Sequence, residues 1–246
     1  MRQALALYLR LDFGRFHSRN PQIIALSQSL GRTPSAVALK LTNLAALDDT
    51  LTQKGMANAS ATDRRVWAEY LQAPDAVLRA YAQQTSRPHT AQGFADRQAA
   101  FEARQGERPV TEHPRRIGQS FFREMILTSY KSCCAITGLD SPALLNASHI
   151  VGWAEDSSIR LNPCNGICLN ALHDRAFDRH LITFDPEYRM MIAPDLPGAT
   201  REQLRKGASE RLMLPARFLP DPEFLARHRD RFHARLEETA RPGANV

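Results

Sequence analysis

The segment from Asn146 to Asp178 (NASHIVGWAEDSSIRLNPCNGICLNALHDRAFD) concentrates histidines, asparagines and aspartates in a stretch rich in turn-forming residues. Within it, His149 and His173 bracket an Asn165–Gly166 pair that is typical of a turn. A loop that only connects two elements has no need of two histidines. Histidine can take up a proton near neutral pH or bind a metal ion, and carboxylates bind divalent cations. The segment therefore has the residue types for acid–base or metal-assisted chemistry.

Three local patterns predict how the chain positions these side chains. Small and apolar residues surround His149, as at the end of a strand, and the Pro- and Gly-containing stretch 162–166 predicts a loop. The sequence ICLNALHDRAFD then has helical spacing, with Leu169, Leu172 and Ala176 on one side. The expected order is strand, loop and helix, with a histidine, an asparagine and a histidine in turn.

This arrangement resembles the HNH endonucleases, whose ββα-metal core holds one divalent cation. The resemblance extends from about Arg116 to Pro194 and rests on FFREMILTSY, CAITG, SHIVGW, NPCNGICLNALHDRAFD and LITF. It looks like the bacterial branch often described as restriction endonucleases. The resemblance implies a metal-dependent enzyme that hydrolyses phosphodiester bonds of DNA.

The resemblance also implies roles for individual residues. His149 would be the general base, Asn165 would hold the loop closed, and His173 would bind the metal. The cation is expected to be Mg²⁺, with Mn²⁺ or another transition metal as alternatives. Many relatives carry a metal ligand immediately before the base, where this chain has Ser148, so a carboxylate must complete the site. Asp178 and Asp174 are the candidates, and Asp178 is preferred.

The four cysteines lie in the central third of the chain. Many HNH domains hold a structural zinc on two Cys-x-x-Cys pairs, but this chain has only an adjacent pair and one Cys-x-x-x-Cys. We therefore expect no structural zinc, with apolar packing in its place.

The net charge is +6 with a pI near 9.4, and arginines supply most of the excess. Arginine pairs well with phosphate, so double-stranded DNA is the favoured partner, although a solvated basic surface has the same composition. The arginines expected to contact nucleic acid near the HNH segment are Arg115, Arg116, Arg160 and Arg175. No apolar run approaches the roughly 20 residues of a membrane-spanning helix. The N-terminal ALALYLRL does not look like a signal peptide, so a cytoplasmic location is expected.

Residues 1–84 are predicted to be helical. Asn20-Pro21 and Thr33-Pro34 each start a short helix, and Gly31 lies between them, as in a helix-turn-helix. In this hypothesis the second helix reads DNA, with Ser35, Lys40 and Asn43 as contacts and Arg32 nearby. The alternative is a plain helical hairpin that packs for stability.

The fold class is therefore predicted as α+β, with three parts. A helical, helix-turn-helix-like domain (1–84) precedes a linker (85–114) and an HNH domain with flanking helices (115–246). LITF and RMMIA are predicted to be two short strands, and DPEFLARHRDRFHARLEE an amphipathic helix.

The function favoured by the sequence is a DNA endonuclease in restriction or anti-phage defence. A homodimer would suit this function, because a double-strand cut needs two active sites or two events. One alternative is a DNA-binding regulator with a vestigial HNH fold. Another is a toxin or defence effector that cuts only when a partner or modified DNA is present.

Overall fold

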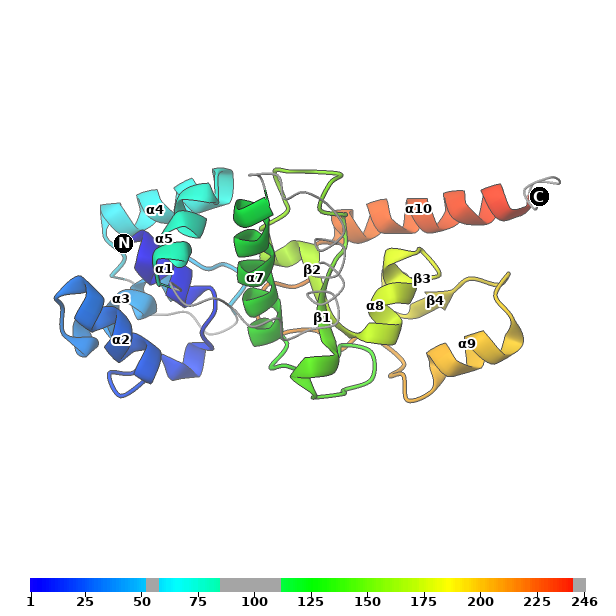
Figure 1. Cartoon of the computed structure of the whole chain (residues 1–246), viewed down its shortest axis with the longest axis horizontal. Helices are drawn as coiled ribbons and strands as arrows, with labels where there is room; N and C mark the ends of the chain where they lie inside the picture. Colours follow the sequence, from blue (N-terminus) through cyan, green and yellow to red (C-terminus); the bar gives the residue numbers. More distant parts are fainter. Residues whose placement is uncertain (52–57, 85–111, 241–246) are drawn as a thin grey trace. The chain divides into compact units, whose positions relative to one another are not determined.

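The computed structural model describes residues 1–51, 58–84 and 112–240. These residues form helices and two small antiparallel sheets, so the α+β class predicted from the sequence is confirmed (Figure 1). The chain divides into two compact units. Unit 1 comprises residues 1–90, 106–129 and 216–218, and unit 2 comprises residues 91–105, 130–215 and 219–246. No helix in the described ranges is long and apolar enough to cross a membrane.

Unit 1 is helical. Its core consists of the apolar faces of these helices, with Leu5, Leu41 and Tyr81 fully buried. The helices are α1 (Arg2–Tyr8), α2 (Pro21–Leu30), α3 (Pro34–Ala45), α4 (Ala61–Gln72), α5 (Asp75–Gln84) and α7 (Glu112–Ser129), with a 3-10 turn η1 (Phe13–Arg15).

The hairpin of α2 and α3 follows directly from its capping residues. The Asn20 and Thr33 side chains accept hydrogen bonds from the first turns of α2 and α3, and each helix starts with proline. Gly31 ends α2 with a φ of 59°, a left-handed conformation that favours glycine. The two predicted helices are therefore present, while DNA reading by α3 stays a prediction.

Helix α7 packs in unit 1. Its Phe121 ring lies 4.9 Å from the ring of Tyr81 in α5, between centroids. Its Glu124 accepts hydrogen bonds from Arg10 at 2.7 Å and from the Tyr81 hydroxyl at 2.8 Å. The predicted division grouped this helix with the HNH segment, whereas its buried apolar face and Glu124 bind it to the N-terminal helices.

The short segment 216–218 also belongs to unit 1. Arg217 is almost fully buried, donates hydrogen bonds to the carbonyl oxygens of Tyr8 and Leu9, and lies 5.0 Å from the centroid of the Tyr8 ring. The helical unit is thus built from three separate stretches of sequence.

The described residues of unit 2 form two antiparallel strand pairs and three α-helices. Strands β1 (Leu145–His149) and β2 (Gly166–Asn170) are antiparallel, and the register pairs His149 with Gly166 and Leu145 with Asn170. Helix α8 (Ala171–Asp178) follows β2 at once and packs on both strands. The remaining elements are 3-10 turns η2 (Pro142–Leu144) and η3 (Pro163–Asn165), strands β3 (Ile182–Phe184) and β4 (Met190–Ile192), and helices α9 (Gly198–Arg205) and α10 (Pro222–Ala240).

The second hairpin and the last helix confirm two predictions from the sequence. Strands β3 and β4 pair antiparallel, as the segments LITF and RMMIA indicated. Helix α10 buries Leu225, His228 and Phe232 on one face and packs on β3. Arg229 of α10 also donates a hydrogen bond to the carbonyl oxygen of Phe184 in β3, at 3.1 Å.

Candidate functional site

His149 lies at the end of β1, partly buried. Its Nε2 atom is 3.0 Å from the carbonyl oxygen of Arg160, across the loop that joins β1 to β2. The pKa of His149 is lowered to about 4, mainly by burial; the hydrogen bond to the Arg160 carbonyl opposes this change, and the charge of Arg160 adds to it. The imidazole is therefore neutral at pH 7. Because Nε2 donates its proton to a carbonyl oxygen, the lone pair that can accept a proton is on Nδ1.

Asn165 joins the two ends of this loop. It is fully buried, and its side-chain oxygen accepts from the Val151 N–H at 2.8 Å. Its Nδ2 donates to the carbonyl oxygens of Val151 at 3.1 Å and Ile159 at 3.4 Å. Its own carbonyl oxygen accepts from the Ile150 N–H at 3.0 Å. These four contacts fix the backbone on both sides of the loop, next to His149 and Arg160.

Asp174 lies on α8 and faces β1. Its carboxylate accepts hydrogen bonds from the Ser148 hydroxyl at 2.5 Å and from the Asn146 amide at 2.6 Å. Burial raises the pKa of Asp174, the two hydrogen bonds oppose that change, and the charge of Asp178 raises it again. The Oδ1 atom of Asn146 is buried and has no hydrogen-bond partner in the described part of the chain. Asp174 thus lies beside an unsatisfied acceptor, directly next to the strand that carries His149.

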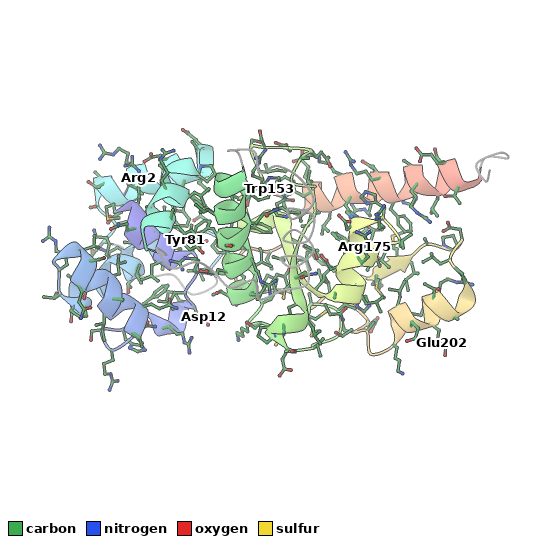
Figure 2. All side chains as sticks on the ribbon, in the orientation of Figure 1. Arg2, Asp12, Tyr81, Trp153, Arg175 and Glu202 are labelled. Atoms are coloured by element: carbon green, nitrogen blue, oxygen red, sulfur yellow. The ribbon has the colours of Figure 1, made fainter. Side chains whose placement is uncertain are left out.

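Asp178 lies one helical turn after Asp174. This spacing puts the two carboxylates on the same face of α8. Asp178 is exposed, and Arg175 is 3.5 Å from it (Figure 2 labels Arg175 on α8). An exposed ion pair of this kind is weak, so Asp178 can exchange Arg175 for another cation.

Residues 134–185 match the HNH endonuclease family. The matched segment contains β1, β2, α8 and β3, and so every residue described above. Residues 134–185 are an HNH endonuclease domain. Comparison with the curated proteins gives no significant match to the chain. The HNH domain indicates nuclease activity, with DNA as the implied substrate, and nucleases of this family generally use a divalent metal ion.

The ring of His173 in the HNH domain lies close to two protein oxygens. It is buried, its Nδ1 atom is 3.0 Å from the side-chain oxygen of Asn170, and its Nε2 atom is 2.9 Å from the carbonyl oxygen of Leu204. Both ring nitrogens therefore lie within hydrogen-bond distance of protein oxygens. The expected role of His173 as a metal ligand stays a prediction. Among the described residues, no three His, Cys, Asp or Glu side chains are grouped as a metal site.

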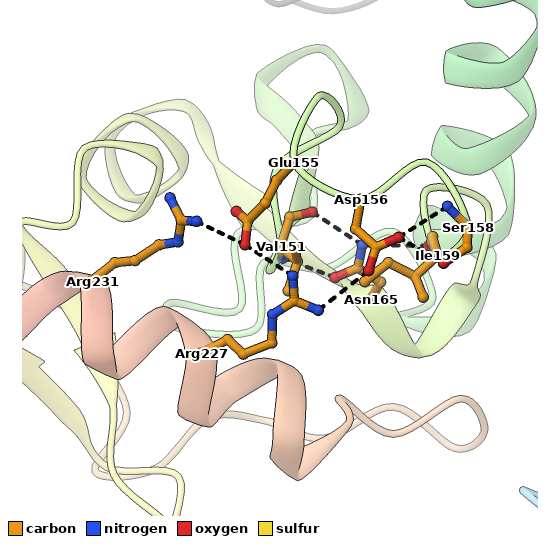
Figure 3. A network of polar contacts seen from close by, with 8 residues as sticks. All are labelled: Val151, Glu155, Asp156, Ser158, Ile159, Asn165, Arg227 and Arg231. Atoms are coloured by element: carbon orange, nitrogen blue, oxygen red, sulfur yellow. Dashed lines mark hydrogen bonds and ion pairs between the residues drawn. The ribbon is translucent and has the colours of Figure 1, made fainter.

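Two arginines of α10 form ion pairs with the loop that joins β1 to β2. Arg227 pairs with Glu155 at 3.0 Å and with Asp156 at 3.4 Å, and Arg231 pairs with Glu155 at 2.8 Å (Figure 3). Asp156 in turn accepts from the N–H and the hydroxyl of Ser158, two residues before Arg160. Sequence reasoning missed these residues, although Arg227 and Arg231 are one helical turn apart on an Arg-rich helix.

The predicted nucleic-acid contacts have different environments. Lys40 donates hydrogen bonds to both carboxylate oxygens of the fully buried Asp63, at 3.0 Å, so its charge is paired within unit 1. Asn43 of the same helix is buried. Arg32 is exposed in the turn between α2 and α3. Arg115 and Arg116 lie in α7, and their side chains are outside the described residues.

Proposed function

We propose that the HNH domain hydrolyses phosphodiester bonds of DNA, with His149 as the general base and a divalent cation bound at Asp174 and Asp178. The observation that carries this proposal is the hydrogen bond from His149 Nε2 to the carbonyl oxygen of Arg160. It selects the tautomer with a lone pair on Nδ1, and Asn165 holds the carbonyl oxygen in place through the loop.

The donor set on α8 and β1 fits Mg²⁺. This ion is usually held by one or two carboxylates and keeps several water ligands. Asp174 and Asp178 provide the carboxylates, and the unsatisfied Oδ1 of Asn146 provides an acceptor for an ion-bound water. Ser148 hydrogen-bonds to Asp174 and can orient that carboxylate, so its hydroxyl need not be a ligand itself. When bound, the cation would supply positive charge against the phosphate and the leaving oxygen.

The residues of the chain would have separate roles in the hydrolysis. A water oxygen forms a bond to phosphorus as its proton passes to Nδ1 of His149. The bond between phosphorus and one sugar oxygen breaks, and that oxygen takes up a proton from solvent. His149 is held neutral before the reaction by burial, which keeps the proton-accepting form fully populated at pH 7.

The helical unit is proposed to bind DNA and help choose the target, in a restriction or anti-phage defence role. The net charge of +6 and the exposed Arg32 support DNA binding, but the buried Asn43 and the paired Lys40 leave α3 few side chains to read bases. A homodimer would supply the two active sites that a double-strand cut requires.

A plasmid cleavage assay tests the proposal. Wild-type protein with Mg²⁺ or Mn²⁺ should convert supercoiled plasmid to nicked or linear DNA, on unmodified or modified plasmid. His149→Ala should lower the rate about 10²-fold or more while leaving DNA binding and the thermal unfolding temperature near those of the wild type. Binding without cleavage by wild-type protein, across metals and DNA types, would favour the DNA-binding regulator instead.

A further inference from the structure

Arg160 contacts the general base of the HNH domain by two routes. Its carbonyl oxygen accepts the hydrogen bond from His149. Its guanidinium carbon lies 5.1 Å from the centroid of the Trp153 ring, and the Trp153 ring meets the His149 ring edge to face, with 5.4 Å between centroids. His149, Arg160 and Trp153 therefore each contact the other two: Arg160 contacts His149 through its main chain and Trp153 through its side chain. These three contacts fix the position of the Arg160 guanidinium relative to the His149 imidazole.

The guanidinium of Arg160, unlike those of several other arginines in unit 2, has no carboxylate partner among the described residues. Within the described ranges it forms no ion pair with a carboxylate, and its Nε atom is buried without a hydrogen-bond acceptor. The arginines of the unit that do pair with carboxylates are Arg175, Arg189, Arg227, Arg231 and Arg235. A partly buried cation with an unsatisfied N–H is costly, so this site favours an anion.

A phosphate oxygen is the anion that fits the position. The planar guanidinium presents N–H groups in a fork that matches two phosphate oxygens, and stacking on an indole leaves its edge available for such bonds. Arg160 and His149 are joined by the hydrogen bond and through the Trp153 ring, so an oxygen bound at the guanidinium lies near the general base.

We propose that Arg160 is a catalytic residue of the HNH domain that binds a non-bridging oxygen of the scissile phosphate, and that Trp153 positions it. This inference rests on the nuclease function proposed above and assigns Arg160 to the reacting phosphate rather than to the DNA backbone elsewhere. As water attacks phosphorus, negative charge grows on the non-bridging oxygens. The guanidinium stabilises that charge while His149 takes the proton.

The test compares plasmid DNA with bis(p-nitrophenyl) phosphate, a small phosphodiester that has no flanking nucleotides, both with Mn²⁺ and full-length protein. Arg160→Met should lower kcat/KM for both substrates by about 10²-fold or more, the usual effect of removing one donor to a developing oxyanion. Arg205→Met, which removes the same charge from the exposed end of α9, should leave hydrolysis of the small substrate unchanged.

Three further variants keep the test decisive if Arg160→Met does not fold. Arg160→Lys keeps the charge but loses the fork, and Trp153→Leu loses the ring under the guanidinium, so each should slow the small substrate, Trp153→Leu by roughly threefold to tenfold. Trp153→Phe keeps a ring and should be closer to wild type.

The outcomes separate the inference from the function. If wild type hydrolyses both substrates and the folded Arg160 variants hydrolyse the small one as fast, Arg160 is a remote DNA contact or a structural residue, and the inference is wrong. If wild type hydrolyses neither substrate, the nuclease function itself fails and this inference fails with it.

Discussion

Replacing Lys40 with methionine should destabilise unit 1, because Asp63 would lose its counter-ion. The Asp63 side chain is fully buried, and Lys40 Nζ contacts both of its oxygens at 3.0 Å. Breaking a buried pair by removing one partner costs about 3–5 kcal/mol. Lys40 is 32% exposed, and Asp63 keeps its hydrogen bonds with Ser60, so we expect a smaller loss of about 1–3 kcal/mol.

Urea unfolding at pH 7 measures this loss, and Asp63→Asn provides the matched control. Asparagine removes the buried charge but can still accept hydrogen bonds at the start of α4. The double variant Lys40→Met/Asp63→Asn should therefore be more stable than Lys40→Met alone. Burial tends to raise the pKa of Asp63, but its hydrogen bonds with Ser60 and the contact with Lys40 leave it lowered. The contribution of the pair is thus present above pH 3.8, the ordinary pKa, and is lost as the pH falls below it.

The same variant separates a structural lysine from one that binds DNA. If Lys40→Met keeps wild-type stability in urea and instead weakens DNA binding, with a reduced dependence of affinity on salt, the ion pair has no structural role. The original interpretation of α3 as a recognition helix would then be favoured.

Other perturbations test the proposed active site and the packing within each of the two units. Asp174→Asn should weaken Mn²⁺ binding about tenfold or more by calorimetry, whereas the fold stays intact; unchanged affinity would put the metal elsewhere. Arg227→Ala should lower kcat for plasmid cleavage with little change in KM, because the loop beside His149 loses the ion pairs of Arg227 with Glu155 and Asp156, and Arg227→Lys should restore part of kcat. Burial, followed by the charge of His180, lowers the pKa of His228 to about 3, so the unfolded chain takes up the proton first as the pH falls below 6.5. Wild type should therefore lose roughly 2 kcal/mol more stability than His228→Gln between pH 6.5 and pH 5, measured by urea unfolding. Deleting residues 1–84 should give insoluble protein, because Phe121 and the rest of the buried face of α7 would be exposed; a soluble, active fragment would contradict this packing.

The sequence by itself determined the local elements of the HNH domain. Asn-Pro and Asn-Gly turns, the spacing of apolar residues and the capping Asn170 all act within a few residues, so strand, loop and helix can be predicted from them. The family match to residues 134–185 follows from the same local pattern. The capped hairpin of α2 and α3 was predictable for the same reason.

Only the tertiary structure decided which side chain faces which partner. Successive residues on a helix point about 100° apart, so His173 and Asp174 cannot both face β1. His173 Nε2 hydrogen-bonds to the carbonyl oxygen of Leu204, which lies 31 residues later in the sequence. Asp174, on another side of α8, accepts hydrogen bonds from Ser148 and Asn146. A periodic pattern identifies the two faces of a helix, but it does not say which of them an element distant in sequence will cover.

Long-range packing also decided the roles of the charged residues. Lys40 and Asp63 are 23 residues apart, and Arg227 lies 72 residues after Glu155. The sequence alone does not distinguish a solvent-exposed basic side chain from one that pairs with a buried carboxylate or holds a loop in place. They differ because burial makes an unpaired charge costly, and burial is set by how the elements pack.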